Sequence, residues 1–221
     1  MSLWPSLSGP SRKPAGGGKP RQLVVLLHGL GADGNDLIGL APYWAPLLPE
    51  AEFISPDAPF PCDMAPYGRQ WFSFQDRSPV SILAGLRASA TILDAFLDEA
   101  LAARNLDERS LALVGFSQGT MMSLYVGLRR QTAPAGILGF SGALVGADTL
   151  PQEIRSRPPV LLVHGDADEV VPFGALEAAV QGLRAAGVPV EDVIRPGLGH
   201  GIDEEGLRRG AEFLRRVFAR S

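Results

Sequence analysis

One short motif in the middle of the chain restricts its fold more than any other segment. The motif G-F-S-Q-G at 115–119 joins an apolar run at 110–116, typical of a buried strand, to an apolar stretch at 118–130, typical of a buried helix. A strand that passes into a helix through one serine must turn very sharply, and glycines beside the serine fit such a turn. The sequence therefore predicts that Ser117 is presented at the end of a strand, beside the free N–H groups of a helix.

Strand and helix signals alternate along the rest of the chain. Helices are expected from the capping pair Ser78-Pro79 to Leu101, around 176–183, and from Asp203 onward, with Glu204 and Glu205 in the first turn. Six strands are expected, at 21–28, 51–55, 110–116, 136–142, 159–165 and 190–195, with one more near 70–74. This alternation predicts an α/β fold with a mostly parallel central sheet flanked by helices.

Length and composition fit one compact domain. The chain has 221 residues, of which 46% are hydrophobic, enough for a sizeable core without disulfides or metals. Residues 1–21 are rich in Pro, Gly and Ser, and we expect them to form a flexible or surface-draped N-terminal arm. Residues 22–221 are then the folded domain.

Charge and cysteine content exclude several classes of partner. The net charge is −4 without long runs of either sign, so we expect no nucleic-acid partner. No uninterrupted apolar run reaches the roughly 18 residues of a membrane span, so no transmembrane segment is expected. Cys62 is the only cysteine, which fits a reducing, cytoplasmic location. The sequence leaves open whether the chain is a monomer or a homodimer.

A serine hydroxyl becomes a good nucleophile only with a base beside it. In the α/β-hydrolase fold, which the strand–serine–helix turn indicates, the base is a histidine that follows the serine and an acid along the chain. Only His200, in a glycine-rich loop, meets this order. His28 and His164 each end a predicted strand, where we expect them to bond to nearby backbone.

The acid that orients His200 must follow the strand at 159–165. Asp166, Asp168 and Glu169 all satisfy this condition, and spacing alone does not choose among them. An oxyanion also needs backbone N–H donors, which we expect from Gln118, directly after the serine, and from Leu30 in the glycine-rich loop after the first strand. No metal is expected, because the three histidines lack zinc-site spacing.

The space around Ser117 bears on substrate size. The chain between Ser117 and residue 165 already holds one predicted helix and two strands, so we expect no cap domain and an open cleft. The loop at 55–79 is long and rich in aromatic residues, which usually marks a functional segment. We expect Trp71 or Phe72 to border an acyl pocket.

Four ordered motifs resemble the phospholipase/carboxylesterase family, which includes the acyl-protein thioesterases. They are LLHGLGADGNDL at 26–37, GFSQGTMMS at 115–123, HGDADEVVP at 164–172 and GLGHGI at 197–202. The resemblance runs from about residue 22 to the C-terminus. It implies a cofactor-free serine esterase that hydrolyses acyl esters, lysophospholipids or S-acyl thioesters. It also assigns Ser117, Asp168 and His200 as a catalytic triad, with Leu30 and Gln118 in the oxyanion hole.

Two other functions use the same fold. A non-catalytic binding protein would leave Ser117 unreactive toward a fluorophosphonate probe. An acyltransferase would use the same triad and differ only in its products when alcohols are present. The intact set of expected site residues favours a serine carboxylesterase acting on a small acyl ester or thioester.

Overall fold

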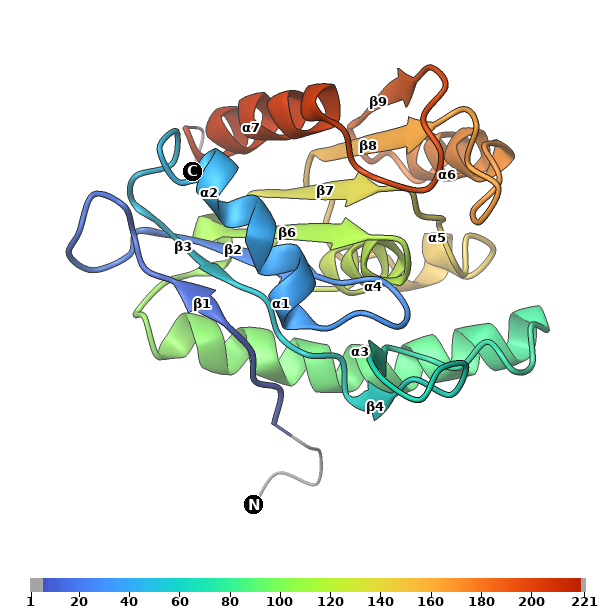
Figure 1. Cartoon of the computed structure of the whole chain (residues 1–221). Helices are drawn as coiled ribbons and strands as arrows, with labels where there is room; N and C mark the ends of the chain where they lie inside the picture. Colours follow the sequence, from blue (N-terminus) through green and yellow to red (C-terminus); the bar gives the residue numbers. More distant parts are fainter. Residues whose placement is uncertain (1–5, 220–221) are drawn as a thin grey trace.

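A computed structural model describes residues 6–219 and contains a twisted seven-stranded sheet (Figure 1). The strand order is β1-β3-β2-β6-β7-β8-β9, and only β1 runs antiparallel to its neighbour. All six principal strands expected from the sequence are present. Together with β1, which was not expected, the strands of the sheet are β1 (Ser11–Arg12), β2 (Gln22–Leu27), β3 (Ala51–Ile54), β6 (Leu111–Phe116), β7 (Gly136–Phe140), β8 (Val160–Gly165) and β9 (Val190–Arg195).

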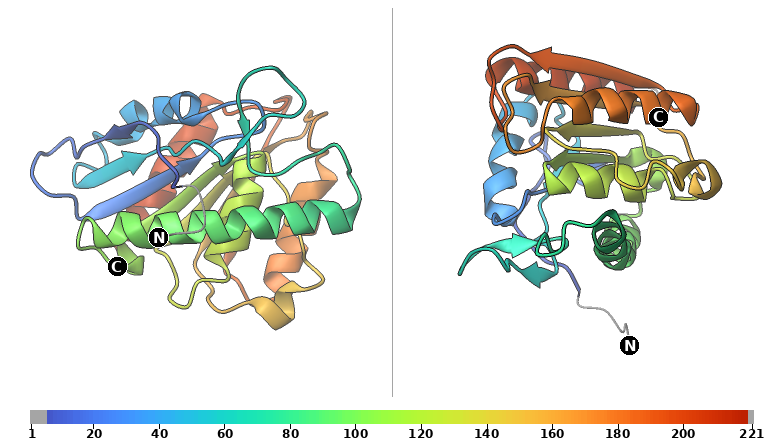
Figure 2. Two further views of the ribbon diagram at one scale, coloured as in Figure 1. Left: turned by 90° about the horizontal axis from the view of Figure 1, so that it is seen from below. Right: turned by 90° about the vertical axis from the view of Figure 1, so that its right-hand side faces the viewer.

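Helices cover both faces of this sheet (Figure 2). One face carries α1 (Gly34–Leu37), α2 (Ala41–Trp44) and α7 (Glu204–Phe218). The other carries α3 (Pro79–Ala102), α4 (Gln118–Gly127) and α6 (Gly174–Ala185). Shorter elements are η1 (Ile38–Leu40), β4 (Phe60–Pro61), β5 (Arg69–Gln70), η2 (Glu108–Ser110) and α5 (Leu150–Glu153). The α/β-hydrolase architecture is thus confirmed, and α5 is the only helix between β7 and β8, so no cap domain is inserted there.

Strand β2 shows why the sequence pattern is apolar without alternation. Leu23, Val25 and Leu27 point to the cluster formed with α3 and α4. Val24 and Leu26 point to the opposite cluster, formed with α2 and α7. All five side chains are fully buried, because successive residues of a strand face opposite sides and both sides are covered.

Two helix starts lie where the sequence predicted them, and a side chain caps each one. The Ser78 hydroxyl accepts a hydrogen bond from the Ser81 N–H, and Pro79 occupies the first turn of α3. The Asp203 carboxylate accepts from the Gly206 N–H at 2.8 Å at the start of α7. These bonds satisfy N–H groups that have no partner within the helix.

The sequence predicted no transmembrane segment, but α3 is long and apolar enough to cross a membrane by length and composition alone. The fold gives it another role. Leu86, Leu93 and Leu97 pack into the core beneath the sheet. On its outer side, Asp94 and Asp98 form ion pairs with Arg130, which follows α4. A helix with these contacts on two sides acts as a core helix of the α/β domain.

The N-terminal arm lies on the edge of the sheet over its described part. Ser11–Arg12 pair with β3, and the carbonyls of Ser8 and Pro10 accept hydrogen bonds from the N–H groups of Asp57 and Ser55. Residues 6–21 are therefore draped on the surface, while residues 1–5 of the predicted arm lie outside the described part. The domain boundary at residue 22 stays a prediction.

Some predicted elements have different limits. The strand expected near 70–74 contains only Arg69–Gln70, which pair with Phe60–Pro61 in a separate two-stranded ribbon. It ends there because the next N–H, that of Trp71, donates to a side chain, Gln118 Oε1, instead of a strand. The helix expected at 118–130 ends at Gly127.

The turn between β6 and α4 lies directly against β2. A Cβ atom on Gly119 would lie 1.7 Å from the Leu27 carbonyl oxygen, and one on Gly115 would lie 2.3 Å from the backbone of Gly119. Real Cβ atoms do not approach so closely, so both positions exclude any side chain. The two glycines of the motif thereby allow α4 to begin at the carboxyl end of the sheet.

We expect Gly119→Ala to lower the free energy of unfolding by more than about 3 kcal/mol, because its methyl group meets rigid backbone. Gly174→Ala is the matched control, since nothing lies within 4 Å of its Cβ position. That control should change stability by no more than about 1 kcal/mol. Urea unfolding of both variants tests the expectation, and equal stabilities would contradict this packing.

Candidate active site

Ser117 is held in an uncommon backbone conformation between β6 and α4. Its φ and ψ are 54° and −116°, a region that few residues other than glycine adopt. Its N–H donates to the Phe140 carbonyl at 2.9 Å, and its carbonyl accepts from the N–H groups of Thr120 and Met121. These bonds keep the serine at the sharp turn that the motif predicts, a kind of backbone strain that clusters at functional sites.

Asp168 is the carboxylate that reaches His200. The distance between Asp168 Oδ2 and His200 Nδ1 is 2.8 Å, and the aspartate side chain is fully buried. Asp166 and Glu169 are exposed. Asp166 Oδ1 instead accepts from the Gly197 N–H at 2.6 Å and so ties the two loops together. The geometry thus separates the three acids that sequence spacing left equivalent.

Hydrogen bonds keep the Asp168 carboxylate charged. Burial by itself raises its pKa, but bonds from His200 and from the N–H groups of Val171 and Val170 lower the pKa below the ordinary value of 3.8. Both backbone N–H groups donate to Oδ1 at 2.9 Å, which leaves Oδ2 for the imidazole. An ionised carboxylate in this position orients His200 and stabilises a positive charge on it.

The loop that carries His200 packs closely onto the end of β8. A Cβ atom on Gly165 would lie 2.0 Å from the Leu198 carbonyl oxygen, so only glycine fits there. The Ala167 N–H donates to the same oxygen at 3.1 Å. The His200 ring also packs against the Phe116 ring, with 4.8 Å between centroids. These contacts place the imidazole next to the residue that precedes Ser117.

Ser117 and His200 line one cavity of about 420 Å³, near the carboxyl ends of β2 and β6. Leu30 belongs to the same lining, on the loop between β2 and α1. Among the main-chain hydrogen bonds of turns, loops and helix caps in residues 6–219, none is donated by the N–H of Leu30 or of Gln118. N–H groups beside a serine that do not bond to a main-chain carbonyl are suited to bind a developing negative charge.

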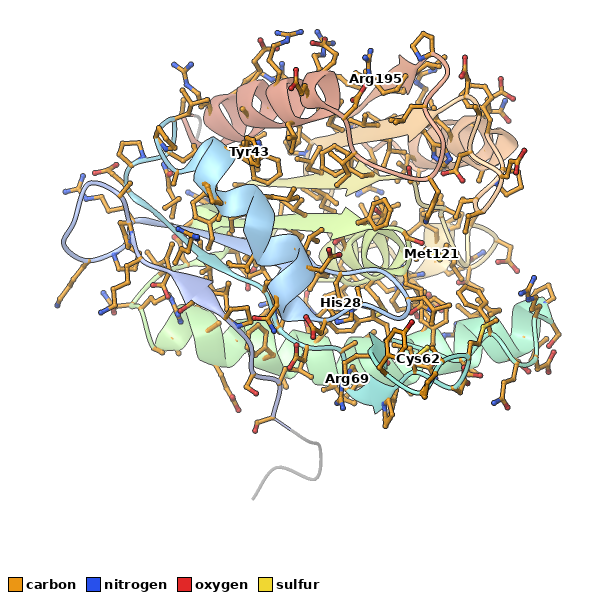
Figure 3. All side chains as sticks on the ribbon, in the orientation of Figure 1. His28, Tyr43, Cys62, Arg69, Met121 and Arg195 are labelled. Atoms are coloured by element: carbon orange, nitrogen blue, oxygen red, sulfur yellow. The ribbon has the colours of Figure 1, made fainter. Side chains whose placement is uncertain are left out.

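The apolar wall of the cavity differs from the expectation. Trp71 and Phe72 are 0% and 1% exposed, and neither lines the cavity. Phe74, from the same loop, does line it, together with Met121 on α4, which Figure 3 labels. The sequence predicted a loop rich in aromatic residues here, but it did not predict which of their rings line the cavity. Other apolar lining residues, which sequence reasoning missed, are Met64, Ile82, Val170 and Val171.

The two other histidines are buried at strand ends and bond to backbone, as expected. His28 Nδ1 donates to the Gly29 carbonyl at 2.7 Å, and Nε2 accepts from the Ala58 N–H at 3.0 Å. His164 Nε2 donates to the Val171 carbonyl at 2.8 Å. In the described part of the chain, no group of three or more His, Cys, Asp or Glu side chains is placed to hold a metal ion.

Comparison with known proteins gives consistent results. A family model described as phospholipase/carboxylesterase matches residues 14–218. The crystal structure of esterase PE8 superposes with a TM-score of 0.92 at 42% identity, over 96% of this chain and 99% of that one. Esterase YpfH of Escherichia coli K12 is 29% identical over 88% of this chain and 82% of its own length. Acyl-protein thioesterase 1 of Gibberella zeae is 29% identical over 87% and 89%.

Neutral His28 makes stability depend on pH. Burial lowers the pKa of His28 below its ordinary value of 6.5, and its bond to the Gly29 carbonyl opposes this effect. Below about pH 6.5 the unfolded chain takes up this proton first, so the free energy of unfolding should fall as pH drops from 7.5 to about 5.5. In His28→Gln, which retains an acceptor for Ala58, this fall should be smaller. The free energy of unfolding would be measured by urea unfolding at each pH. An equal fall with pH in the two proteins would contradict the assignment.

Proposed function

The chain belongs to the phospholipase/carboxylesterase family of serine hydrolases, and on this premise we propose that it hydrolyses acyl esters or thioesters through Ser117, His200 and Asp168. One observation carries the proposal. A serine in a strained strand–helix turn shares a cavity with a histidine, and the Nδ1 atom of this histidine bonds to a buried carboxylate at 2.8 Å. This arrangement supplies a nucleophile, a base and the group that orients the base.

In the first half of the reaction, Ser117 Oγ attacks the carbonyl carbon of the substrate. Its proton moves to His200 Nε2, while Asp168 accepts the hydrogen bond from Nδ1 and stabilises the imidazolium. The N–H groups of Leu30 and Gln118 bind the oxyanion of the tetrahedral intermediate. The carbon–oxygen or carbon–sulfur bond then breaks, and His200 gives its proton to the leaving alcohol or thiol. The product is an acyl group esterified to Ser117.

In the second half, a water molecule enters where the leaving group was. His200 takes one of its protons as the oxygen attacks the acyl carbon, and a second oxyanion forms between the same N–H donors. When this intermediate collapses, His200 returns the proton to Ser117 Oγ and the carboxylic acid leaves. These residues supply every proton transfer in the cycle.

Three parts of the substrate face different residues of the cavity lining. The oxyanion faces Leu30, and the leaving group faces His200, which must protonate it. The remaining direction leads to the apolar side chains of Phe74, Ile82 and Met121, which fit the hydrocarbon of an acyl group. Relatives named carboxylesterase and acyl-protein thioesterase support an ester or a thioester at the reacting carbon. Lysophospholipids share the same acyl ester chemistry.

One cysteine bears on the cellular setting that we propose. Cys62 is buried and forms no disulfide, which supports the reducing cytoplasm as the location. The absence of a nucleic-acid partner stays a prediction from the net charge of −4. The choice between monomer and homodimer stays open in the same way.

We expect Ser117→Ala and His200→Ala each to lower kcat/KM for p-nitrophenyl butyrate by a factor on the order of 10³ or more, with the fold retained. The double variant should be scarcely slower than either single one, because the two residues act in one step. Wild-type protein should react with a fluorophosphonate probe and Ser117→Ala should not. A probe-resistant wild type would indicate a binding protein, and additive losses would contradict a shared step.

Asp168→Asn should reduce kcat by a factor of about 10⁴, because an amide favours the wrong tautomer of His200. Asp166→Asn is the matched control, since its oxygen can still accept from Gly197 and it does not reach His200. It should change stability by at most about 1 kcal/mol and leave kcat near the wild-type value. The opposite ranking in steady-state kinetics would transfer the role of the acid to Asp166.

The substrate class is tested by direct comparison of acyl chains and leaving groups. A series of p-nitrophenyl esters of increasing chain length, a palmitoyl thioester and a lysophospholipid would be hydrolysed in parallel by the wild type and by Ser117→Ala. The proposal requires Ser117-dependent release of a carboxylic acid from at least the ester series. Acyl transfer to an added alcohol, with little free acid, would indicate an acyltransferase.

A further inference from the structure

Trp71 lies between the two segments that carry the proposed oxyanion donors, although it does not reach the cavity. Its indole Nε1–H donates to the His28 carbonyl at 3.0 Å, at the end of β2. Its main-chain N–H donates to the side-chain oxygen of Gln118 at 3.0 Å, at the start of α4. One buried residue thus bonds to both sides of the site.

The side chain of Gln118 is used completely by the segment around Trp71. Its Oε1 accepts from Trp71, and its Nε2 donates to the Phe72 carbonyl at 2.7 Å. The residue is fully buried. Both ends of the amide thus join the first turn of α4 to residues 71–72. The main-chain N–H of Gln118 is therefore held in place by bonds that leave it free.

The loop that carries Leu30 is bonded to the same segment. The Gly31 N–H donates to the Arg69 carbonyl at 2.9 Å, and the Arg69 N–H donates to the Ala32 carbonyl at 2.8 Å. With the indole bond to His28, these contacts fix the chain on both sides of Leu30. Figure 3 labels His28 and Arg69, two of the residues in these contacts.

Trp71 is itself held firmly. Its side chain is 0% exposed, and its ring lies beside the His28 ring, with 5.8 Å between centroids. Its carbonyl accepts a hydrogen bond from the hydroxyl of Ser89 on α3. The residue therefore connects the long core helix to the loop and the helix that flank Ser117.

We propose that Trp71 is a positioning residue that sets the separation and direction of the Leu30 and Gln118 N–H groups. The inference rests on the proposed function, because it presumes that these N–H groups bind the oxyanion. Donors fixed in advance stabilise charge in the transition state without reorganisation. When the indole bond is lost, the loop at 28–31 can shift relative to α4, and the two donors no longer converge on one oxygen.

The test is Trp71→Phe, which keeps a large buried ring and removes only the indole N–H. We expect kcat for p-nitrophenyl butyrate to fall by about tenfold or more, with KM little changed, because the ground-state carbonyl binds the donors weakly. The inhibition constant of a trifluoromethyl ketone, whose Ser117 adduct is tetrahedral, should rise by a similar factor. Titration of reactive serine corrects each rate for the active fraction.

Trp44→Phe is the matched control. Trp44 on α2 is 1% exposed, and its indole N–H also donates to a main-chain carbonyl, that of Leu207, at 3.0 Å. It lies in the core cluster on the opposite face of the sheet. The same chemical change there should lower stability but leave kcat and the ketone inhibition constant within about twofold of wild type. A merely structural role for Trp71 would give this result in Trp71→Phe too.

Gln118→Met provides a second variant and carries the test if Trp71→Phe does not fold. It retains the main-chain donor and the side-chain length but loses both bonds to residues 71–72. We expect the same fall in kcat with weaker ketone binding, and less than additive losses in the double variant. Wild-type ketone binding together with a wild-type kcat in either folded variant would overturn the inference. If instead Ser117→Ala were as active as wild type, the proposed function itself would fail.

Discussion

The contact between Gly119 and the Leu27 carbonyl determines where everything else in the site can lie. It allows α4 to begin directly above the end of β2, at a distance that a side chain would prevent. Ser117 then stands over the sheet, and the N–H groups that begin α4 lie beside the loop after β2. Because the sheet and its helices are rigid and tightly packed, this single approach brings a nucleophile and two sets of backbone donors together.

Two buried ionisable groups near this turn differ in their charge. Asp168 is buried, but it accepts hydrogen bonds from His200 and from the N–H groups of Val170 and Val171, so its pKa is lowered and its charge is retained. His28 is buried among main-chain groups and bonds in its neutral form, so its pKa is lowered by desolvation. The fold thus keeps one anion to support His200, while the histidine behind the Leu30 loop stays uncharged.

Much of this structure follows from local patterns in the sequence. Short residue patterns predicted the six principal strands, and the Ser78–Pro79 pair and the acidic first turn after Asp203 predicted two helix starts, because these signals act within a few residues. Three results depend on tertiary contacts instead. The two-residue strand β1 has no pattern of its own, and the choice of Asp168 among the three acids depends on its bond to His200, on another loop. The ring of Trp71 turns to the Leu30 loop because a distant carbonyl, that of His28, accepts its N–H.

The central claim is that Ser117 carries the acyl group during turnover. The most direct measurement is mass spectrometry of the wild-type protein, acid-quenched during steady-state hydrolysis of a p-nitrophenyl ester. The account predicts a mass increase equal to the acyl group less the hydrogen it replaces, located by peptide mapping on Ser117 and absent from Ser117→Ala. Acylation of another residue such as Cys62, or acylation that persists in Ser117→Ala, would contradict it.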